Sequence, residues 1–245
     1  PLAAICAYVC WKLLTRYETK IVRNPIDIVG FVLLIIWVGA LQIMLDEGKN
    51  LDWFSSNLII ALAIIAAIGF VSFLIWELTE KHPIVDIRVF RHRGFSAAVL
   101  TISLTFAGFF AANVLTPLWL QSFMGYTATD AGMTTAWIGI TAFFVAPAAA
   151  ALSTKVDPRK LVFFGVLWMA LMTGFRTIAT TEMGYWDIAW PLMLLGLSMP
   201  FFFIPSTAAA LSSVDEVETN SAAGLMNFMR TLAGAMATSL VTSSW

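Results

Sequence analysis

The feature that most constrains this chain is residues 94–129, a run of thirty-six residues without a charged side chain. An α-helix rises ~1.5 Å per residue, so about twenty apolar residues cross the ~30 Å hydrocarbon layer of a membrane. Arg91 and Arg93 precede the run and Asp130 follows it. It therefore holds one full crossing, roughly residues 96–118, and a further turn or more that emerges at the far surface.

Seven other hydrophobic segments repeat this pattern along the chain. Their apolar runs are continuous and do not alternate with polar residues, which favours helices over the strands of a membrane barrel. Hydrophobic residues make up 60% of the chain and charged residues 12%, about half the charged share of a soluble domain. The sequence predicts an all-α integral membrane protein. The other segments are residues 1–11, 28–45, 57–76, 131–153, 161–180, 188–213 and 219–245.

The basic residues of the loops predict the orientation of these helices. Counted in chain order, the first, third and fifth loops carry eleven Lys and Arg residues, whereas the second, fourth and sixth carry only Lys49. Basic residues accumulate in cytoplasmic loops, so the odd-numbered loops are predicted to be cytoplasmic. The seventh loop should also be cytoplasmic, although it is acidic, because acidic residues have little influence on orientation.

The third loop, residues 77–93, predicts an amphipathic linker. Apolar residues after Pro83 interleave with Asp86, Arg88 and Arg91, as in a short helix that lies on the membrane surface with its arginines at the headgroups. Its position between two spans argues against nucleic-acid binding. His82 and His92 have no nearby ligand partners in the sequence, so no metal site is predicted.

Two short patterns in the chain admit more than one interpretation. Cys6 and Cys10 share one face of the first segment, as buried thiols or as a metal or redox pair. In residues 153–161, Asp157 followed by Pro158 suits a helix N-cap and first helical position, with Arg159 and Lys160 facing the cytoplasm. This loop is either an ordinary capped turn or part of a functional gate.

Four stretches make the chain resemble the C-terminal part of a fourteen-helix drug:proton antiporter of the major facilitator superfamily, of the EmrB type. They are LDEGKNLDWF (45–54), PIVD (83–86), GYTATDAG (125–132) and NFMRTLAG (227–234). The resemblance covers essentially the whole chain. It implies that residues 1–27 are the end of a truncated helix and a loop, that 28–76 form two additional helices between the halves, and that 94–245 form five of the six helices of the second half.

The resemblance also gives the loop at residues 153–161 a role. It falls where the superfamily places the second-half copy of its cytoplasmic gating loop, and Asp157, Arg159 and Lys160 match the charged positions of that motif. The leading glycine of the motif is absent. The acidic residue and fifth-helix motif that the family uses for proton coupling lie outside this sequence, and so does the last helix. No Asp or Glu lies within any complete predicted span.

Two arginines inside predicted spans need an explanation, because a charge at mid-membrane costs at least ~2.5 kcal/mol. Arg176 is close enough to the outer end of its span to reach the headgroups. Arg230 lies about eleven residues into its helix, near the midplane. Helical spacing gathers Asn227, Arg230, Thr231 and Gly234 on one face that should point inward. Arg230 then serves either transport or packing, bonded to backbone carbonyls.

On the 94–129 run, Asn113, Thr116 and Gln121 are weaker candidates for a substrate path, since lone amides often serve as interhelical hydrogen bonds. The resemblance implies export of hydrophobic, amphipathic compounds across a bacterial inner membrane by alternating access. It implies a proton gradient as the energy source, no cofactor, and as partners the N-terminal half, a periplasmic adaptor and an outer-membrane channel. The alternative is a non-transporting scaffold that supplies helices to a partner. No membrane enzyme is predicted, because no complete span carries an Asp pair, a His or a metal cluster.

Overall fold

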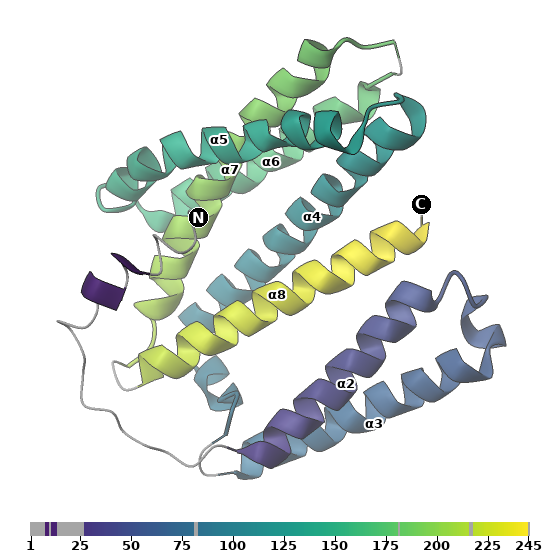
Figure 1. Ribbon diagram of the computed structural model, residues 1–245. Coiled ribbons are helices and arrows are strands. Elements are labelled where there is room, and N and C mark those ends of the chain that lie inside the picture. The colour runs from purple at the N-terminus through teal and green to yellow at the C-terminus, as the bar shows by residue number, and fades with distance from the viewer. Residues whose placement is uncertain are drawn as a thin grey trace.

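A computed structural model describes residues 8–9, 11–13, 27–80, 83–180, 182–215 and 218–244. Cys6, Cys10 and His82, and most of the first predicted segment, lie outside these described residues. Long α-helices account for most of the rest (Figure 1). They are α2 (Ile28–Glu47), α3 (Asn57–Thr79), α4 (Arg93–Phe123), α5 (Ala128–Ser153), α6 (Pro158–Phe175), α7 (Tyr185–Leu211) and α8 (Thr219–Ser244).

These seven helices coincide with the predicted segments, with ends shifted by a few residues. Six of them, α2 to α7, are long and apolar enough to cross a membrane. α8 has 26 residues, so it is long enough, but it does not reach the same apolarity. Asn227, Arg230 and several hydroxyl side chains lower it. The chain is a multi-pass membrane protein.

The helices run antiparallel to their neighbours in sequence, as the loop charges predict. The helix ends that adjoin the predicted cytoplasmic loops lie at the left of Figure 1, and the ends that adjoin the short outer loops lie at the right. The outer loops are tight: residues 48–56 contain only the 3-10 helix η2 (Trp53–Ser55), and Thr127 caps α5 by accepting a hydrogen bond from the Asp130 amide, 3.2 Å away.

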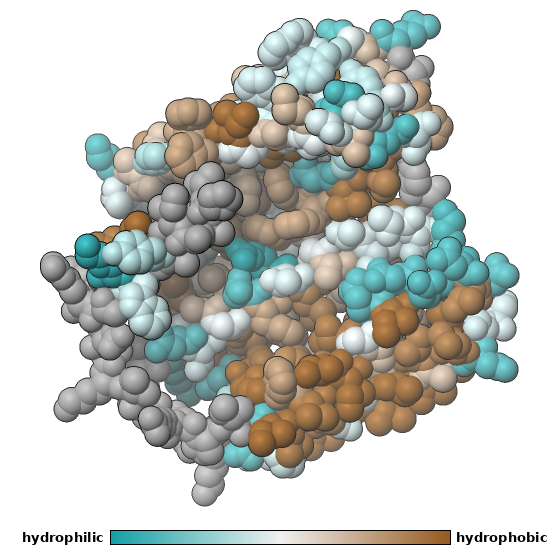
Figure 2. All heavy atoms as spheres, in the orientation of Figure 1, coloured by the Kyte–Doolittle hydropathy of each residue, from teal (hydrophilic) through white to brown (hydrophobic). Residues whose placement is uncertain are grey.

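α7 is the most buried helix and sits between α5 and α6, while α4 packs along α8. Small residues permit the close contacts. A Cβ on Gly165 of α6 would lie 2.7 Å from the backbone nitrogen of Phe202 on α7, so only glycine fits there without a shift. α2 and α3 form a separate hairpin that contacts the bundle through α8. Figure 2 shows apolar residues covering this hairpin, as expected of a surface that faces lipid.

The linker differs from its prediction. Its helical part is only the five-residue 3-10 helix η3 (Ile87–Arg91), and most of its apolar side chains pack on other parts of the protein. Val89 is fully buried in a cluster that includes Phe95 of α4. Arg88 donates to the carbonyl oxygens of Leu78 and Glu80, 2.8 and 3.1 Å away, so it caps the end of α3.

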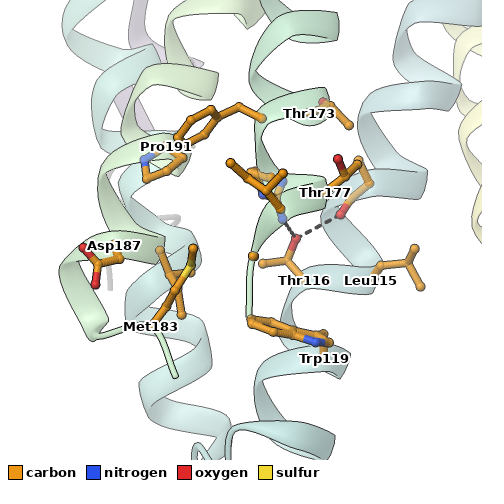
Figure 3. A pocket seen from close by; sticks show the side chains of 14 residues that line it. Leu115, Thr116, Trp119, Thr173, Thr177, Met183, Asp187 and Pro191 are labelled. Carbon is orange, nitrogen blue, oxygen red and sulfur yellow. Dashed lines mark hydrogen bonds between the residues drawn. The ribbon is translucent and has the colours of Figure 1, made fainter. Parts of the chain in front are cut away.

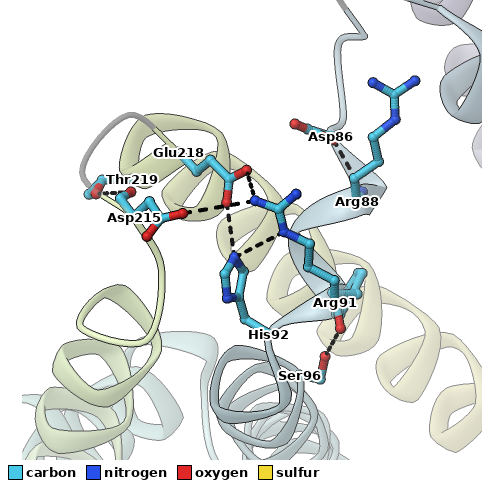
Figure 4. Close-up of polar contacts among 9 residues, drawn as sticks. Asp86, Arg88, Arg91, His92, Ser96, Asp215, Glu218 and Thr219 are labelled. Carbon is cyan, nitrogen blue, oxygen red and sulfur yellow. Dashed lines mark hydrogen bonds and ion pairs between the residues drawn. The ribbon is translucent and has the colours of Figure 1, made fainter.

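Ion pairs also connect the linker to the start of α8 and to the residues just before it. Arg91 donates to Glu218 at 2.7 Å and lies 3.9 Å from Asp215, and His92 lies 3.1 Å from the second oxygen of Glu218 (Figure 4). The atoms of His92, Asp215 and Glu218 that could ligate a metal ion lie within 4.8 Å of one another. Arg91 already supplies positive charge to these carboxylates, so the arrangement is an ion-pair cluster, and the absence of a metal site stays a prediction.

Candidate functional site

The best-defined polar site in the bundle is built around Arg230 of α8. Its guanidinium carbon lies 4.7 Å from the ring centre of Phe106 on α4 and 5.1 Å from that of Phe203 on α7. The same guanidinium donates a hydrogen bond to the side-chain oxygen of Asn227, one turn earlier, at 2.5 Å. Three helices thus meet at one half-buried cation. Aromatic faces attract cations electrostatically, more strongly where water is excluded.

The two faces of α8 separate as the helical spacing predicts, but only part of the polar face points inward. Gly234 is buried, and a Cβ there would lie 3.6 Å from the ring of Phe110 on α4. Asn227 and Thr231 are exposed; the Thr231 hydroxyl donates to the Asn227 carbonyl at 2.8 Å. The opposite, apolar face turns toward α2 and α3, where Leu225, Phe228, Leu232 and Met236 line an apolar groove of about 640 Å³.

The amide side chains of α4 bond to their own helix instead of forming the interhelical hydrogen bonds that the sequence offered as an alternative, and their role in a substrate path stays a prediction. Asn113 donates to the Phe109 carbonyl at 2.7 Å, and Gln121 donates to the Pro117 carbonyl at 3.0 Å. The side-chain oxygen of Asn113 is buried and has no hydrogen-bond partner within the described chain. Asn113 follows Phe106 and Phe110 at helical spacing, so it extends the face of α4 that meets α8.

The cytoplasmic loop between α5 and α6 has the predicted local structure. Asp157 is the N-cap of α6, accepting a hydrogen bond from the Arg159 amide at 2.9 Å, and Pro158 occupies the first turn. Arg159 and Lys160 are exposed. The capped turn is confirmed, whereas a gating role is a property of motion and remains a prediction.

Arg176 lies at the C-terminal end of α6, and its reach to the membrane surface stays a prediction. It caps the C-terminus of α6, and its guanidinium donates to the Thr116 hydroxyl on α4. Together these residues line a pocket of about 420 Å³ between α4, α6 and α7, near the outer ends of these helices (Figure 3). Arg176 and Thr116 are sixty positions apart in the chain, so no local sequence pattern predicts their hydrogen bond.

Glu77 of α3 is a residue that the sequence did not single out. Since α3 continues three residues past the predicted span to Thr79, this carboxyl group lies inside the helix, and it is fully buried. One oxygen accepts from the Val85 amide of the linker at 3.2 Å, and the other has no hydrogen-bond partner in the described residues. The helices extend past the predicted spans, so acidic residues also lie near the ends of α2, α5 and α7, and the prediction of spans without acidic residues is wrong for these longer bounds.

The chain is 40% identical over its full length to the multidrug export protein EmrB of Haemophilus influenzae, and 39% identical to the EmrB of Escherichia coli K12. It is 38% identical to the fatty acid resistance protein FarB of Neisseria gonorrhoeae. In each case it covers 48% of the relative, so the chain spans about half the length of these curated relatives.

A family model described as Major Facilitator Superfamily matches residues 28–238, which is most of the described helical bundle. The match includes the α2–α3 hairpin, the linker, and α4 to α8 as far as Thr238. It contains both arginine sites and the capped cytoplasmic loop. The chain belongs to the major facilitator superfamily.

Proposed function

We propose that this chain forms the C-terminal half of a secondary transporter that exports hydrophobic and amphipathic drugs. Full-length similarity to proteins named for multidrug export and fatty acid resistance supports this function. Export would draw its energy from the proton gradient across a bacterial inner membrane, without a cofactor. As the chain spans about half of these relatives, an N-terminal helical bundle is the expected partner within one transporter.

The observation that carries the proposal is Arg230 held between the rings of Phe106 and Phe203. Arg230 is held by these two rings and by the Asn227 side chain, and not by a carboxylate. It can therefore exchange these partners for a substrate without leaving a buried negative charge unpaired. Aromatic rings offer large apolar surfaces to drug-like molecules, and a few polar groups orient them. Arg230 would supply orientation, and the rings the contact area.

Alternating access would then come from this bundle rocking against the N-terminal one, with substrate bound between them. The Asp157, Arg159 and Lys160 loop would contact the opposing bundle on the cytoplasmic side. A periplasmic adaptor and an outer-membrane channel would carry the substrate onward. A scaffold that supplies helices to a partner would have the same fold, but the similarity to named exporters favours transport.

The test is to change Arg230 in the full-length protein and to measure drug export and membrane abundance in the same cells. Arg230→Lys keeps the charge and loses the planar group that spans two rings and Asn227. We expect normal abundance and loss of most drug resistance. Arg230→Ala should behave likewise, and its insertion should improve because a costly charge is gone. Lys49→Ala, in an exposed outer loop, is the matched control.

A packing role for Arg230 gives the opposite order. Arg230→Ala would then accumulate poorly, and Arg230→Lys would export nearly as well as the parent. That result would remove Arg230 from the transport path. Parental export by both variants would also contradict the proposed site.

A further inference from the structure

The pocket beside Arg176 combines one cation with apolar walls. Trp119, Ile178, Met183, Ile188 and Pro191 contribute apolar surface, and they come from α4, α7 and the segment that joins α6 to α7. Such a wall suits an alkyl chain or another apolar body. Its volume of about 420 Å³ lies within the range of pockets that hold small molecules.

Arg176 lines this pocket, and a hydrogen bond to Thr116 holds its guanidinium. The Thr116 hydroxyl is buried and donates its own hydrogen to the Ala112 carbonyl at 2.9 Å. Its oxygen therefore faces Arg176 with a free lone pair and accepts from the guanidinium (Figure 3). A guanidinium carries five N–H donors, so this bond leaves further donors for a ligand.

No carboxylate neutralises Arg176 within the described parts of the chain. The Asp215 and Glu218 carboxylates pair with Arg91 and His92, at the predicted cytoplasmic side and away from this pocket. Asp187 also lines the pocket, but its carboxylate accepts from the Gly184 amide at 2.9 Å and serves the N-terminus of α7. In Figure 3 it lies across the pocket from Thr116. The pocket thus offers an oriented cation without an acidic partner.

We propose that this pocket binds a single-chain amphiphilic anion, whose carboxylate or phosphate pairs with Arg176 while its alkyl chain lies along the apolar wall. The charges of the loops place the site near the outer surface of the membrane, where such molecules can enter. Guanidinium binds carboxylate and phosphate through paired N–H donors, and the pairing is stronger where the surroundings are apolar. The site goes beyond the export proposed at Arg230, because its occupancy can be measured without transport.

The experiment measures binding of radiolabelled laurate to the full-length protein in nanodiscs of phosphatidylcholine at neutral pH, counting only what excess unlabelled laurate displaces. We expect Arg176→Gln to weaken specific binding by about tenfold or more, the range for a hydrogen bond to a charged group. Arg176→Lys should fall between the parent and Arg176→Gln. Lys49→Gln removes one positive charge from the same side of the membrane and should bind like the parent.

Competitors identify the ligand class. Dodecyl phosphate should displace laurate, whereas dodecanol, which has the same chain and no charge, should be at least about tenfold weaker. Equal displacement by dodecanol would overturn the proposal, since the pocket would then be merely apolar. Unchanged binding in Arg176→Gln would overturn it too, as would displacement by dihexanoyl phosphatidylglycerol but not by dodecyl phosphate. Elution of each variant as a monodisperse protein guards against loss of fold.

Discussion

Single side chains fix the ends of the helices in this protein, and Asp157 shows how. Its carboxylate satisfies the Arg159 amide at the start of α6, where the first backbone N–H groups have no partner within the helix. The following proline sets the backbone for the first turn. The cap is a purely local device, so its structural contribution can be separated from any contribution of its charge.

We expect Asp157→Asn to preserve most of the cap and Asp157→Ala to lose it. Alanine should cost ~0.5–2 kcal/mol of local stability, because nothing replaces the bond to the Arg159 amide. If the loop also gates transport, Asp157→Asn in the full-length protein should lower drug export at nearly normal abundance. Export and abundance are measured together. Normal export by Asp157→Asn would mean that the loop is only a capped turn and has no gating role.

The same contrast between local and distant contacts explains which residues the sequence could place. Asp157 and Pro158 are adjacent, so their cap can be predicted. Arg176 meets Thr116 sixty residues away, and Arg230 meets rings on two other helices. The sequence indicates that both arginines need partners, since charge in a membrane is costly, but it does not identify the partners.

At the scale of whole helices, a small group of hydrogen bonds ties the α2–α3 hairpin to α8 of the bundle. Gln42 of α2 donates to the Ser239 hydroxyl of α8 at 2.7 Å and to Asp46 on its own helix at 3.1 Å. Ser239 is buried and also donates to Asp46. One turn further, the Ser243 hydroxyl donates to the Leu45 carbonyl at 2.8 Å. These bonds lie at the outer end of the hairpin.

We expect Gln42→Leu and Ser239→Ala to be coupled, because each change removes the same interhelical bond. The coupling energy in a double-mutant cycle should be about 0.6–1.7 kcal/mol, as for other hydrogen bonds between membrane helices. Unfolding in mixed micelles with sodium dodecyl sulfate measures it. Gln121→Leu is the control, since Gln121 bonds its own helix, and it should be additive with Ser239→Ala. If the changes in unfolding free energy of Gln42→Leu and Ser239→Ala were additive, the bond between these side chains would contribute nothing to stability.

Helix positions were largely predictable from the sequence, whereas the linker was not. Apolar runs of about twenty residues have one stable form in a bilayer, so α2 to α7 follow from composition. Residues 77–93 alternate apolar and basic side chains, a pattern that fits a surface helix equally well as a segment packed on protein. Burial of Val89 against α4 decides between these two, and that contact depends on the assembled bundle.

The orientation of the whole molecule rests on eleven basic residues in the odd-numbered loops against one in the others. In a variant without Cys6 and Cys10, single cysteines at Asn50 or Gly184 should react with an impermeant thiol reagent from the outer side. A cysteine at Lys155 should react only after the membrane is opened. Reversed labelling would overturn every inside and outside assignment made above, including the outer position of the Arg176 pocket.

The modest apolarity of α8 has a consequence for how the protein is made. A helix that carries Arg230 and Asn227 gains little by entering lipid alone, and its place in the bundle depends on the surface that α4 presents. During synthesis α4 leaves the ribosome before α8, and so do α5, α6 and α7. By then Phe106, Phe110 and Phe203 are available to receive the arginine and the small residues beside it. Because α4 and α7 precede α8 in the chain, the aromatic surface that contacts Arg230 is synthesised before α8 itself.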